Sequence, residues 1–407
     1  MNFPQGIIWL LLFLLALYVL FVAYKLLHEL RFRRKPYIAL KELIYQHQNP
    51  IAANEILHEV ILFGDFGYIS PAGTDTVQQA LKKLLPVTGP KTTLALLGDN
   101  IYPVGLPPEN HRHRKLAEAK MLAQLRIFKN YAGKVTFLSG NHDWNKGRPN
   151  GYQQLLRQEA FVTGQLGPVY LPAHGCPGPV LVEVNSRLAL IAINTQWWVQ
   201  KGEKPIGKAM NCGVDSEKEF FERFRQMLTD NSHRNVLVLA HHPLYSNALH
   251  GGKHTVKQHI FPLTAAHKKL YIPVPVAGSL YPLYRKLIGA AEDMSHPRYR
   301  KMRKKLLRIL KQYSNVIYTA GHDHNLQHFR RHGNHYIISG SASKTSFVSR
   351  GGKASFTHEH LGFFKVVYYQ NGQVWLQALE PDLAQNNGSV NLVYQAQLYG
   401  PAVANEY

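Results

Sequence analysis

Residues 93–102 read TLALLGDNIY, and this stretch gives the clearest indication of the fold. Its first five residues suit a buried strand, and Gly98 ends the run. Asp99 and Tyr102 follow at once. In α/β proteins the active site lies beyond the carboxyl ends of parallel strands, so the stretch predicts such a strand with site residues at its end.

The same pattern recurs along most of the chain. Further strand-like apolar runs cover residues 59–65, 135–141, 187–195, 235–242, 315–324 and 335–341. Helix-like stretches lie between them, for example at 75–85, 113–130 and 216–229. This alternation predicts an α/β domain with parallel strands. Residues 360–380 differ, because two apolar runs flank Asn371-Gly372, which predicts a hairpin.

The composition is that of a globular protein with an excess of basic side chains. The 407 residues include 47 Lys and Arg against 25 Asp and Glu, a formal net charge of +22, and 45% are hydrophobic. This excludes wholesale disorder, and the length allows two or three domains or one large one. The only cysteines are Cys176 and Cys212, which excludes a disulfide scaffold and a zinc ribbon but leaves the redox compartment open.

The N-terminal stretch 6–24 carries no charge over 19 residues. As a helix it would be about 28 Å long, close to the thickness of a bilayer's hydrocarbon core. We therefore predict an uncleaved transmembrane anchor, rather than a buried core helix or a cleaved signal peptide. Five Lys and Arg follow between residues 25 and 35, so the positive-inside rule favours a cytoplasmic location for the rest of the chain, with the opposite side as the alternative.

These patterns divide the chain into five parts. We expect a tail at 1–5, the anchor at 6–24, a basic juxtamembrane segment and linker at 25–55, one large domain at 56–385 and a C-terminal tail at 386–407. That last segment is either loosely structured or an added strand.

A basic, apolar insertion interrupts the large domain at residues 253–311. It contains 14 Lys and Arg against two acids, Glu292 and Asp293. Residues 271–289 are apolar, aromatic and proline-rich, and 298–311 have the pattern of a basic amphipathic helix. We predict a membrane-surface element; a solvated charged face and a nucleic-acid groove are the alternatives.

Five short motifs at the ends of predicted strands contain side chains of the kinds that bind metal ions. They are Gly64-Asp65-Phe66-Gly67, Gly98-Asp99-Asn100-Ile101-Tyr102, Gly140-Asn141-His142-Asp143, Ala240-His241-His242-Pro243 and Gly321-His322-Asp323-His324. Singly, each motif could be a turn or a solvated loop. Together, they suit two metal ions at one sheet edge, bridged by a carboxylate.

The motifs and their order resemble the calcineurin-like metallophosphoesterases, and within them the purple acid phosphatases. Most of that superfamily has Asp-x-His at the first strand, whereas this chain has Gly67 in place of the histidine. Purple acid phosphatases have Asp-x-Gly there and supply a tyrosine from GDxxY, which matches Tyr102 here. The resemblance covers residues 58–345. It implies a four-layer sandwich of two mixed β-sheets flanked by helices, preceded here by one N-terminal transmembrane helix.

The resemblance also implies the site residues. A first metal ion would be bound by Asp65, Asp99, Tyr102 and His324, and a second by Asp99, Asn141, His241 and His322, with Asp99 as the bridge. The histidines that match the family's two phosphate-facing, catalytic positions are His142 and His250. Tyrosine ligation implies Fe(III) beside Zn, Mn or Fe(II), although the ligand types also permit two divalent ions.

The function that follows is a membrane-anchored dinuclear phosphatase, which hydrolyses phosphomonoesters by attack of a metal-bound hydroxide. The insertion suggests a phosphorylated lipid as substrate. A phosphodiesterase or nucleotide pyrophosphatase on the same site is one alternative, and an inactive membrane scaffold or phospho-ligand binding module is another. Nucleic acid is not an expected partner, and the oligomeric state is not predicted.

Overall fold

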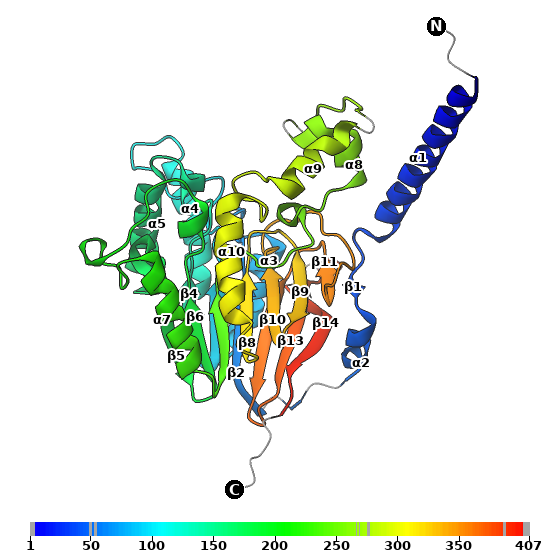
Figure 1. The fold of residues 1–407 in the computed structure, drawn as a ribbon. Helices are drawn as coiled ribbons and strands as arrows, with labels where there is room; N and C mark the ends of the chain where they lie inside the picture. The colour runs from blue at the N-terminus through cyan, green and yellow to red at the C-terminus, as the bar shows by residue number, and fades with distance from the viewer. Residues whose placement is uncertain are drawn as a thin grey trace.

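The computed structural model describes residues 5–48, 51–52, 55–265, 267, 269–274, 277–385 and 388–401. Two mixed β-sheets pack face to face, and helices cover their outer faces (Figure 1). The expected four-layer sandwich with one N-terminal apolar helix is therefore confirmed.

The first sheet has six strands in the order β14-β13-β12-β2-β3-β4. Their bounds are β2 Ile56–Phe63, β3 Thr92–Leu96, β4 Lys134–Phe137, β12 Phe363–Tyr369, β13 Val374–Pro381 and β14 Val390–Tyr399. Strands β2, β3 and β4 are parallel, and β12 and β13 form the predicted hairpin.

Strand β14 lies within 386–407, the segment expected as a C-terminal tail. Tyr394, Ala396 and Leu398 alternate along it and are buried in the core between the sheets, which fixes this segment as an added strand. The large domain therefore continues to Tyr399. Residues 386–387 and 402–407 of the expected tail lie outside the described residues.

The second sheet has eight strands in the order β1-β11-β9-β10-β8-β7-β6-β5. Their bounds are β1 Tyr37–Ile38, β5 Val180–Asn185, β6 Leu188–Ala192, β7 Asn235–Leu239, β8 Val316–Ala320, β9 Leu326–Arg331, β10 Asn334–Ser339 and β11 Phe356–His358. Strands β6, β7, β8 and β10 are parallel, so their carboxyl ends lie at one edge.

The helices follow the predicted alternation. Their bounds are α1 Gln5–Phe32, α2 Leu43–Gln46, α3 Thr76–Leu84, α4 Arg114–Phe128, α5 Gly151–Leu166, α6 Gln196–Val199, α7 Glu217–Asp230, α8 Val256–Ile260, α9 Leu280–Leu287 and α10 Pro297–Leu310. The three helical stretches predicted at 75–85, 113–130 and 216–229 are thus confirmed as α3, α4 and α7.

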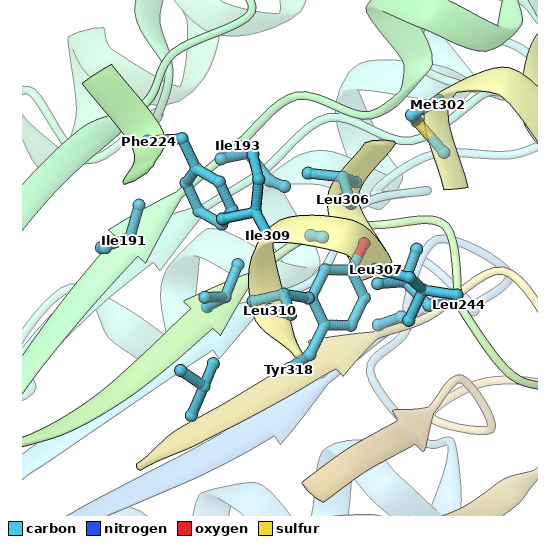
Figure 2. Close-up of a cluster of buried hydrophobic side chains, with 14 of the residues drawn as sticks. Ile191, Ile193, Phe224, Leu244, Met302, Leu306, Leu307, Ile309, Leu310 and Tyr318 are labelled. Carbon is cyan, nitrogen blue, oxygen red and sulfur yellow. The ribbon is translucent and has the colours of Figure 1, made fainter. Parts of the chain in front are cut away.

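Helix α10 is part of the domain core, and this corrects the predicted role of 298–311. The stretch is a basic amphipathic helix, but its apolar side faces the eight-stranded sheet. Figure 2 shows Leu310 beside Tyr318 of β8, and these two side chains and that of Leu306 are fully or almost fully buried. Because this apolar side is already covered, α10 cannot insert it into a bilayer, and the candidate membrane element shrinks to about residues 253–296.

Helix α1 is longer than the apolar run that predicted it, and none of its residues is buried. It is long and apolar enough to cross a membrane. Beyond it, the expected linker is partly structured. Arg33 forms an ion pair of 2.8 Å with Glu359, and Arg350 donates to the Lys35 carbonyl at 2.9 Å, so the base of α1 is tied to the domain. Strand β1 then pairs with β11.

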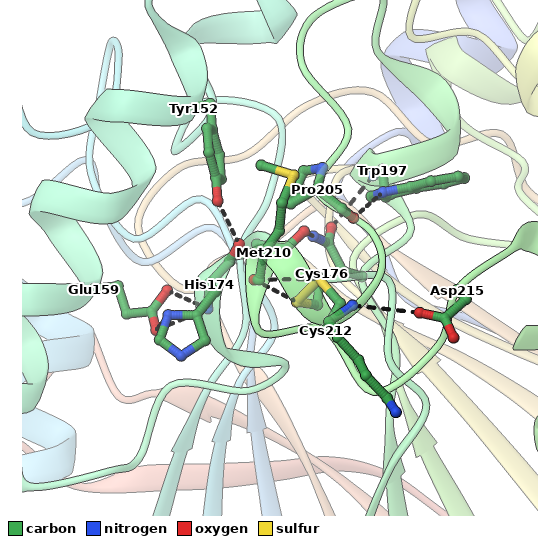
Figure 3. The surroundings of a disulfide bond; sticks show 12 residues. Tyr152, Glu159, His174, Cys176, Trp197, Pro205, Met210, Cys212 and Asp215 are labelled. Carbon is green, nitrogen blue, oxygen red and sulfur yellow. Dashed lines mark hydrogen bonds and ion pairs between the residues drawn. A yellow bond between two sulfur atoms is a disulfide. The ribbon is translucent and has the colours of Figure 1, made fainter.

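Cys176 and Cys212 form a disulfide, with their Cα atoms 5.5 Å apart. Figure 3 shows the bond beside a turn in which the His174 N–H donates to the Glu159 carboxylate of α5. The sequence did not predict this pairing, because 36 residues separate the two cysteines and only the fold brings them together.

Candidate metal centre

The backbone at the strand ends directs three of the expected ligands into one site. Asp65, Asp99 and His322 have φ angles of 60°, 56° and 69°, a left-handed conformation that costs non-glycine residues about 1–3 kcal/mol. Such strain concentrates at functional sites. Gly140, which precedes Asn141, must be a glycine for the Asp99 side chain to fit, because a Cβ on Gly140 would lie 2.4 Å from Asp99 Oδ1.

The first group of side chains surrounds the Tyr102 hydroxyl. Its oxygen lies 2.9 Å from Asp65 Oδ1 and 2.9 Å from Asp99 Oδ2. His324 Nε2 lies 3.3 Å from the same hydroxyl and 3.2 Å from Asp65 Oδ1. Two carboxylates, a phenol and an imidazole therefore converge, as expected for the first metal ion.

The second group surrounds the Asn141 side-chain oxygen. His241 Nε2 lies 3.1 Å from it, and His322 Nδ1 lies 3.2 Å from it. His241 Nε2 is also 3.6 Å from Asp99 Oδ1. The Asp99 carboxylate thus presents Oδ2 to the first group and Oδ1 to the second, which is the placement that a bridging ligand needs.

The tautomers of two histidines fit cation binding. His241 Nδ1 lies 2.7 Å from the Leu97 carbonyl, and His322 Nε2 lies 3.1 Å from the Glu292 carbonyl. A carbonyl only accepts, so each of these nitrogens carries the proton. The opposite nitrogen of each ring then presents a lone pair toward Asn141, as metal-binding histidines do when their other nitrogen is held by a backbone carbonyl.

The electrostatics of the groups support the same interpretation. Burial, together with nearby Lys344, lowers the pKa of His324 to about 3, so its ring is neutral and able to bind a cation. Burial and the adjacent Asp99 raise the pKa of Asp65 above its usual range. Both carboxylates are fully or almost fully buried, and two such anions together require cationic compensation.

The predicted phosphate-facing histidines flank the two groups. The His142 ring lies 4.3 Å from the Tyr102 ring between centroids, and the His142 N–H donates to Asp99 Oδ1 at 2.8 Å. The His250 ring lies 4.2 Å from the His322 ring. Both side chains remain partly exposed, 15% for His142 and 26% for His250, so each can reach a ligand at the mouth of the site.

Sequence reasoning missed two residues of the site. Asp143 accepts hydrogen bonds from the backbone of Gly140, Asp99 and Asn100, and so holds two ligand loops together; its place in the Gly140–Asp143 motif was the available signal. Lys344 Nζ lies 3.5 Å from the centroid of the Tyr102 ring. Lys344 follows β10 in a loop without a recognisable motif, so no signal could have found it.

His242 is buried behind the second group. Its Nδ1 lies 2.9 Å from Thr195 Oγ1, and its Nε2 lies 3.4 Å from a Glu292 carboxylate oxygen. His241, His242 and His322 also form a group whose ligand atoms are close enough to hold a metal ion, as do Asp65, Asp99 and His241. The hydrogen bonds of His242 to both neighbours favour a supporting position.

The comparisons with known proteins identify the family of the chain. The model of the calcineurin-like phosphoesterase family matches residues 58–326, which confirms the resemblance. No curated protein sequence matches the chain.

Solved structures resemble the chain at low identity, and the first of them shows the same fold. The Plasmodium protein described as GAP50, the anchor in the inner membrane complex, has a TM-score of 0.51 and 13% identity over 85% of this chain and 90% of that chain. Purple acid phosphatase PPD1 from yellow lupin (Lupinus luteus) seeds has a TM-score of 0.47 and 13% identity, covering 84% of this chain and 53% of that one. PhoD has a TM-score of 0.48 and 10% identity, covering 86% and 72%.

Proposed function

The chain belongs to the calcineurin-like phosphoesterases, and we propose that it is a membrane-anchored phosphatase that hydrolyses phosphomonoesters at a dinuclear metal centre. The observation that carries the proposal is the orientation of His241 and His322. Each ring is held by a backbone carbonyl on one nitrogen and turns the other toward Asn141 and the buried Asp99. Histidines that bind metal ions are held in this way, with the second ring nitrogen on a backbone carbonyl.

The metal ligands in this proposal form two sets that share Asp99. They are Asp65, Asp99, Tyr102 and His324 for the first ion, and Asp99, Asn141, His241 and His322 for the second. The phenol oxygen at the first site favours Fe(III), and the second site suits Zn, Mn or Fe(II). When bound, the two ions would supply Lewis-acid activation of water and of the phosphate oxygens.

The protein's own cations and proton donors would act on the substrate. His142 beside Tyr102 and His250 beside His322 can donate hydrogen bonds to phosphate, or a proton to the leaving oxygen. Lys344 adds a positive charge above the Tyr102 ring. A monoester carries up to two negative charges on its phosphoryl group, whereas a diester carries one. This concentration of donors therefore favours the monoester over the phosphodiester or nucleotide pyrophosphate alternatives.

A phosphorylated lipid is the substrate class that we propose. The insertion exposes nine large apolar side chains, at Leu263, Leu270, Tyr271, Ile272, Leu280, Leu283, Tyr284, Leu287 and Ile288. Figure 1 shows α8 and α9 on the side of the domain from which α1 extends. Exposed apolar surface of this extent marks an interaction site.

The depth of the insertion suits a bilayer surface. The Val256 N–H at the start of α8 donates to Glu29 Oε2 of α1 at 2.8 Å. Glu29 is five residues past Tyr24, the end of the uncharged run, which is about 7.5 Å along a helix. This is headgroup depth, and Lys253, Lys257 and Lys286 of the same segment would attract anionic lipid.

Point variants test the lipid proposal. Deleting the insertion would also remove residues that contact the site, so we choose Leu283→Ser with Leu287→Ser, both exposed on α9. The pair is expected to lower the hydrolysis of a lipid monophosphate in vesicles severalfold and to leave hydrolysis of a soluble monoester unchanged. Leu383→Ser, equally exposed outside the insertion, is the control. Equal activity of the pair and the wild type on vesicles would refute the lipid substrate.

The side of the membrane is a further part of the proposal. The basic residues after the anchor predict a cytoplasmic domain, and that prediction stays untested. The Cys176–Cys212 disulfide weighs against it, because such bonds persist in oxidising compartments and are rare in the cytosol. We therefore place the domain on the oxidising side of the membrane.

A scaffold without catalysis is the alternative from another class. It is favoured by one observation, the similarity of fold to the Plasmodium protein described as an anchor in a membrane complex. A measurement of phosphoester hydrolysis distinguishes the phosphatase from the scaffold.

Hydrolysis of a panel of soluble monoesters, lipid monoesters and diesters tests the proposed function, with inorganic phosphate measured for the monoesters and the released alcohol measured for the diesters. Full-length protein in detergent, supplied with iron, zinc or manganese, is expected to hydrolyse monoesters fastest. Asp99→Asn should lose at least a thousandfold in kcat, because both groups depend on this carboxylate. Faster diester hydrolysis would favour the diesterase, and an inert wild type would favour the scaffold.

A further inference from the structure

The segment that returns from the insertion enters the site. Met294 donates its backbone N–H to the His250 carbonyl at 3.0 Å, and the Glu292 carbonyl accepts from His322. Residues 290–294 therefore lie against a proposed catalytic histidine and a proposed metal ligand. The insertion is not merely an appendage at the mouth of the site.

Asp293 is the charged centre of this segment. Its side chain is only 1% exposed, and its Oδ1 accepts from His250 Nδ1 at 3.0 Å. Arg285 donates to both carboxylate oxygens, with Nε 2.5 Å from Oδ2, and the Ala290 N–H donates to Oδ2 at 2.8 Å. A buried ion pair repays its desolvation only when its partners are satisfied in this way.

The contact fixes the ring of His250. Because the carboxylate accepts from the Nδ1–H, that nitrogen is occupied, and Nε2 is the nitrogen left to face a ligand, to which it donates when the ring carries both protons. Among the described residues, His250 Nε2 has no protein hydrogen bond. The ring packs on His322 at 33° between planes, so its position is set by Asp293 on one edge and by His322 on one face.

Arg285 links this contact to the outer side of the insertion. It lies on α9, and its guanidinium faces inward to Asp293, while Leu283, Tyr284 and Leu287 of the same helix are exposed. One helix therefore carries both the candidate membrane-facing side chains and the support of a catalytic-site histidine.

We propose that Asp293, held by Arg285 of α9, is a positioning residue that orients His250 toward the substrate. This inference rests on the proposed function, and it makes the insertion a working part of the site. Asp293 does not contact the substrate in this proposal; it acts through the direction in which His250 Nε2 points.

A double-mutant cycle on a soluble monoester tests the proposal. Asp293→Asn keeps the side-chain shape but removes the negative charge that holds Arg285 and the His250 ring in place. We expect kcat to fall about tenfold with little change in KM, as for other residues that orient a site histidine. In the His250→Ala background the same substitution should have no further effect. Equal losses in both backgrounds would indicate a purely structural role and would overturn the proposal.

Two further variants control for folding. Arg285→Lys keeps the positive charge but cannot donate from two nitrogens to both carboxylate oxygens, and it should show a smaller loss in kcat that also vanishes without His250. It replaces Asp293→Asn in the cycle if that variant fails to fold. Glu59→Gln removes a partly buried ion pair with Lys365 elsewhere in the domain and should leave kcat unchanged.

The positioning role of Asp293 can also be tested if the protein proves not to be a phosphatase. If the wild type releases no phosphate, the same cycle is measured on the binding of orthophosphate by calorimetry, with zinc-loaded protein. Coupling between Asp293 and His250 in the affinity would support positioning in a phosphate-binding protein. Additive effects would overturn the positioning role whether or not the protein is an enzyme.

Discussion

Asp99 is the residue on which both halves of the site depend. Its Oδ2 accepts from Tyr102, while Oδ1 accepts from the His142 N–H and faces His241. Burial alone would raise the pKa of Asp99, but the nearby His142 and His241 lower it, so the carboxylate is ionised. An ionised, buried carboxylate between two sets of ligand atoms is the strongest reason to expect two cations rather than one.

Lys344 is placed to attract the phosphate of a substrate, and a single substitution can test this. Its ammonium lies over the Tyr102 ring, and burial lowers its pKa while Asp65 and Asp99 oppose that shift. If Lys344 attracts the substrate phosphate, Lys344→Gln should raise KM for a monoester about tenfold and change kcat less than threefold. Steady-state kinetics check this, with the exposed Lys83→Gln as control. An unchanged KM would remove Lys344 from the binding site.

The residues that converge in the site could be named from the sequence because each follows a strand within a short motif, and the parallel strands bring the motifs to one edge. Their role as metal ligands stays a prediction. Three residues near the site could not be found from the sequence, namely Lys344, Arg285 and Asp293. They come from loops and from the insertion, and their places depend on how those segments return to the domain. The pairing of His250 with Asp293 joins residues 43 positions apart.

At the level of elements, two basic amphipathic segments of the insertion have different roles. Helix α10 buries its apolar side against the eight-stranded sheet, whereas α9 exposes Leu280, Leu283 and Leu287. Sequence alone predicted a helix in one and an apolar segment in the other. The sequence could not show that one apolar side is buried and the other exposed. An amphipathic pattern indicates that a helix has an apolar side, but it does not indicate what that side packs against.

We therefore expect substitutions in the buried side of α10 to lower the stability of the fold without changing binding to a membrane. Leu306 is fully buried among sheet and helix side chains, so Leu306→Ala should lower the free energy of unfolding by about 2–5 kcal/mol. The loss is measured by chemical unfolding in detergent. The Leu283 and Leu287 substitutions should show little loss in the same assay. Similar losses for both helices would contradict their separate roles.

Strand β2 contains a histidine that makes the fold sensitive to acid. His58 lies 2.9 Å from Thr93 Oγ1, and burial with nearby Lys134 lowers its pKa to about 4. The unfolded chain binds a proton near pH 6.5, whereas the folded protein binds it only near pH 4. Stability therefore falls as the pH decreases through this window.

His58→Gln should abolish that part of the pH dependence. We expect the midpoint of thermal unfolding to fall less between pH 7 and pH 4.5 in the variant than in the wild type. The exposed His233→Gln serves as the control and should follow the wild type. Parallel curves for His58→Gln and the wild type would contradict the shifted pKa.

At the level of the whole molecule, the disulfide and the basic segment after α1 point to opposite sides of the membrane. If the domain lies on the oxidising side, protein denatured directly from its native membranes should contain no free thiol. Both cysteines should react with a maleimide only after reduction. Two reactive thiols without reductant would restore the cytoplasmic prediction.

The sandwich brings the anchor, the insertion and the strand ends to one side of the molecule (Figure 1). The overall fold could be predicted because five motifs and the strand–helix alternation agree. The disulfide and the return of the insertion into the site could not, since each depends on contacts between distant segments. For residues 386–407 the sequence left a loose tail and an added strand open, and the structure shows the strand.

The central claim is a dinuclear centre that hydrolyses monoesters, and its most direct test is a metal titration of chelator-treated, full-length protein. Bound metal and phosphate release are measured together, in the wild type and in Asp99→Asn. We predict that wild-type activity rises to a plateau at two metal ions per chain, and that Asp99→Asn binds fewer and stays inactive. Full activity without added metal, or equal activity in the two proteins, would contradict the claim.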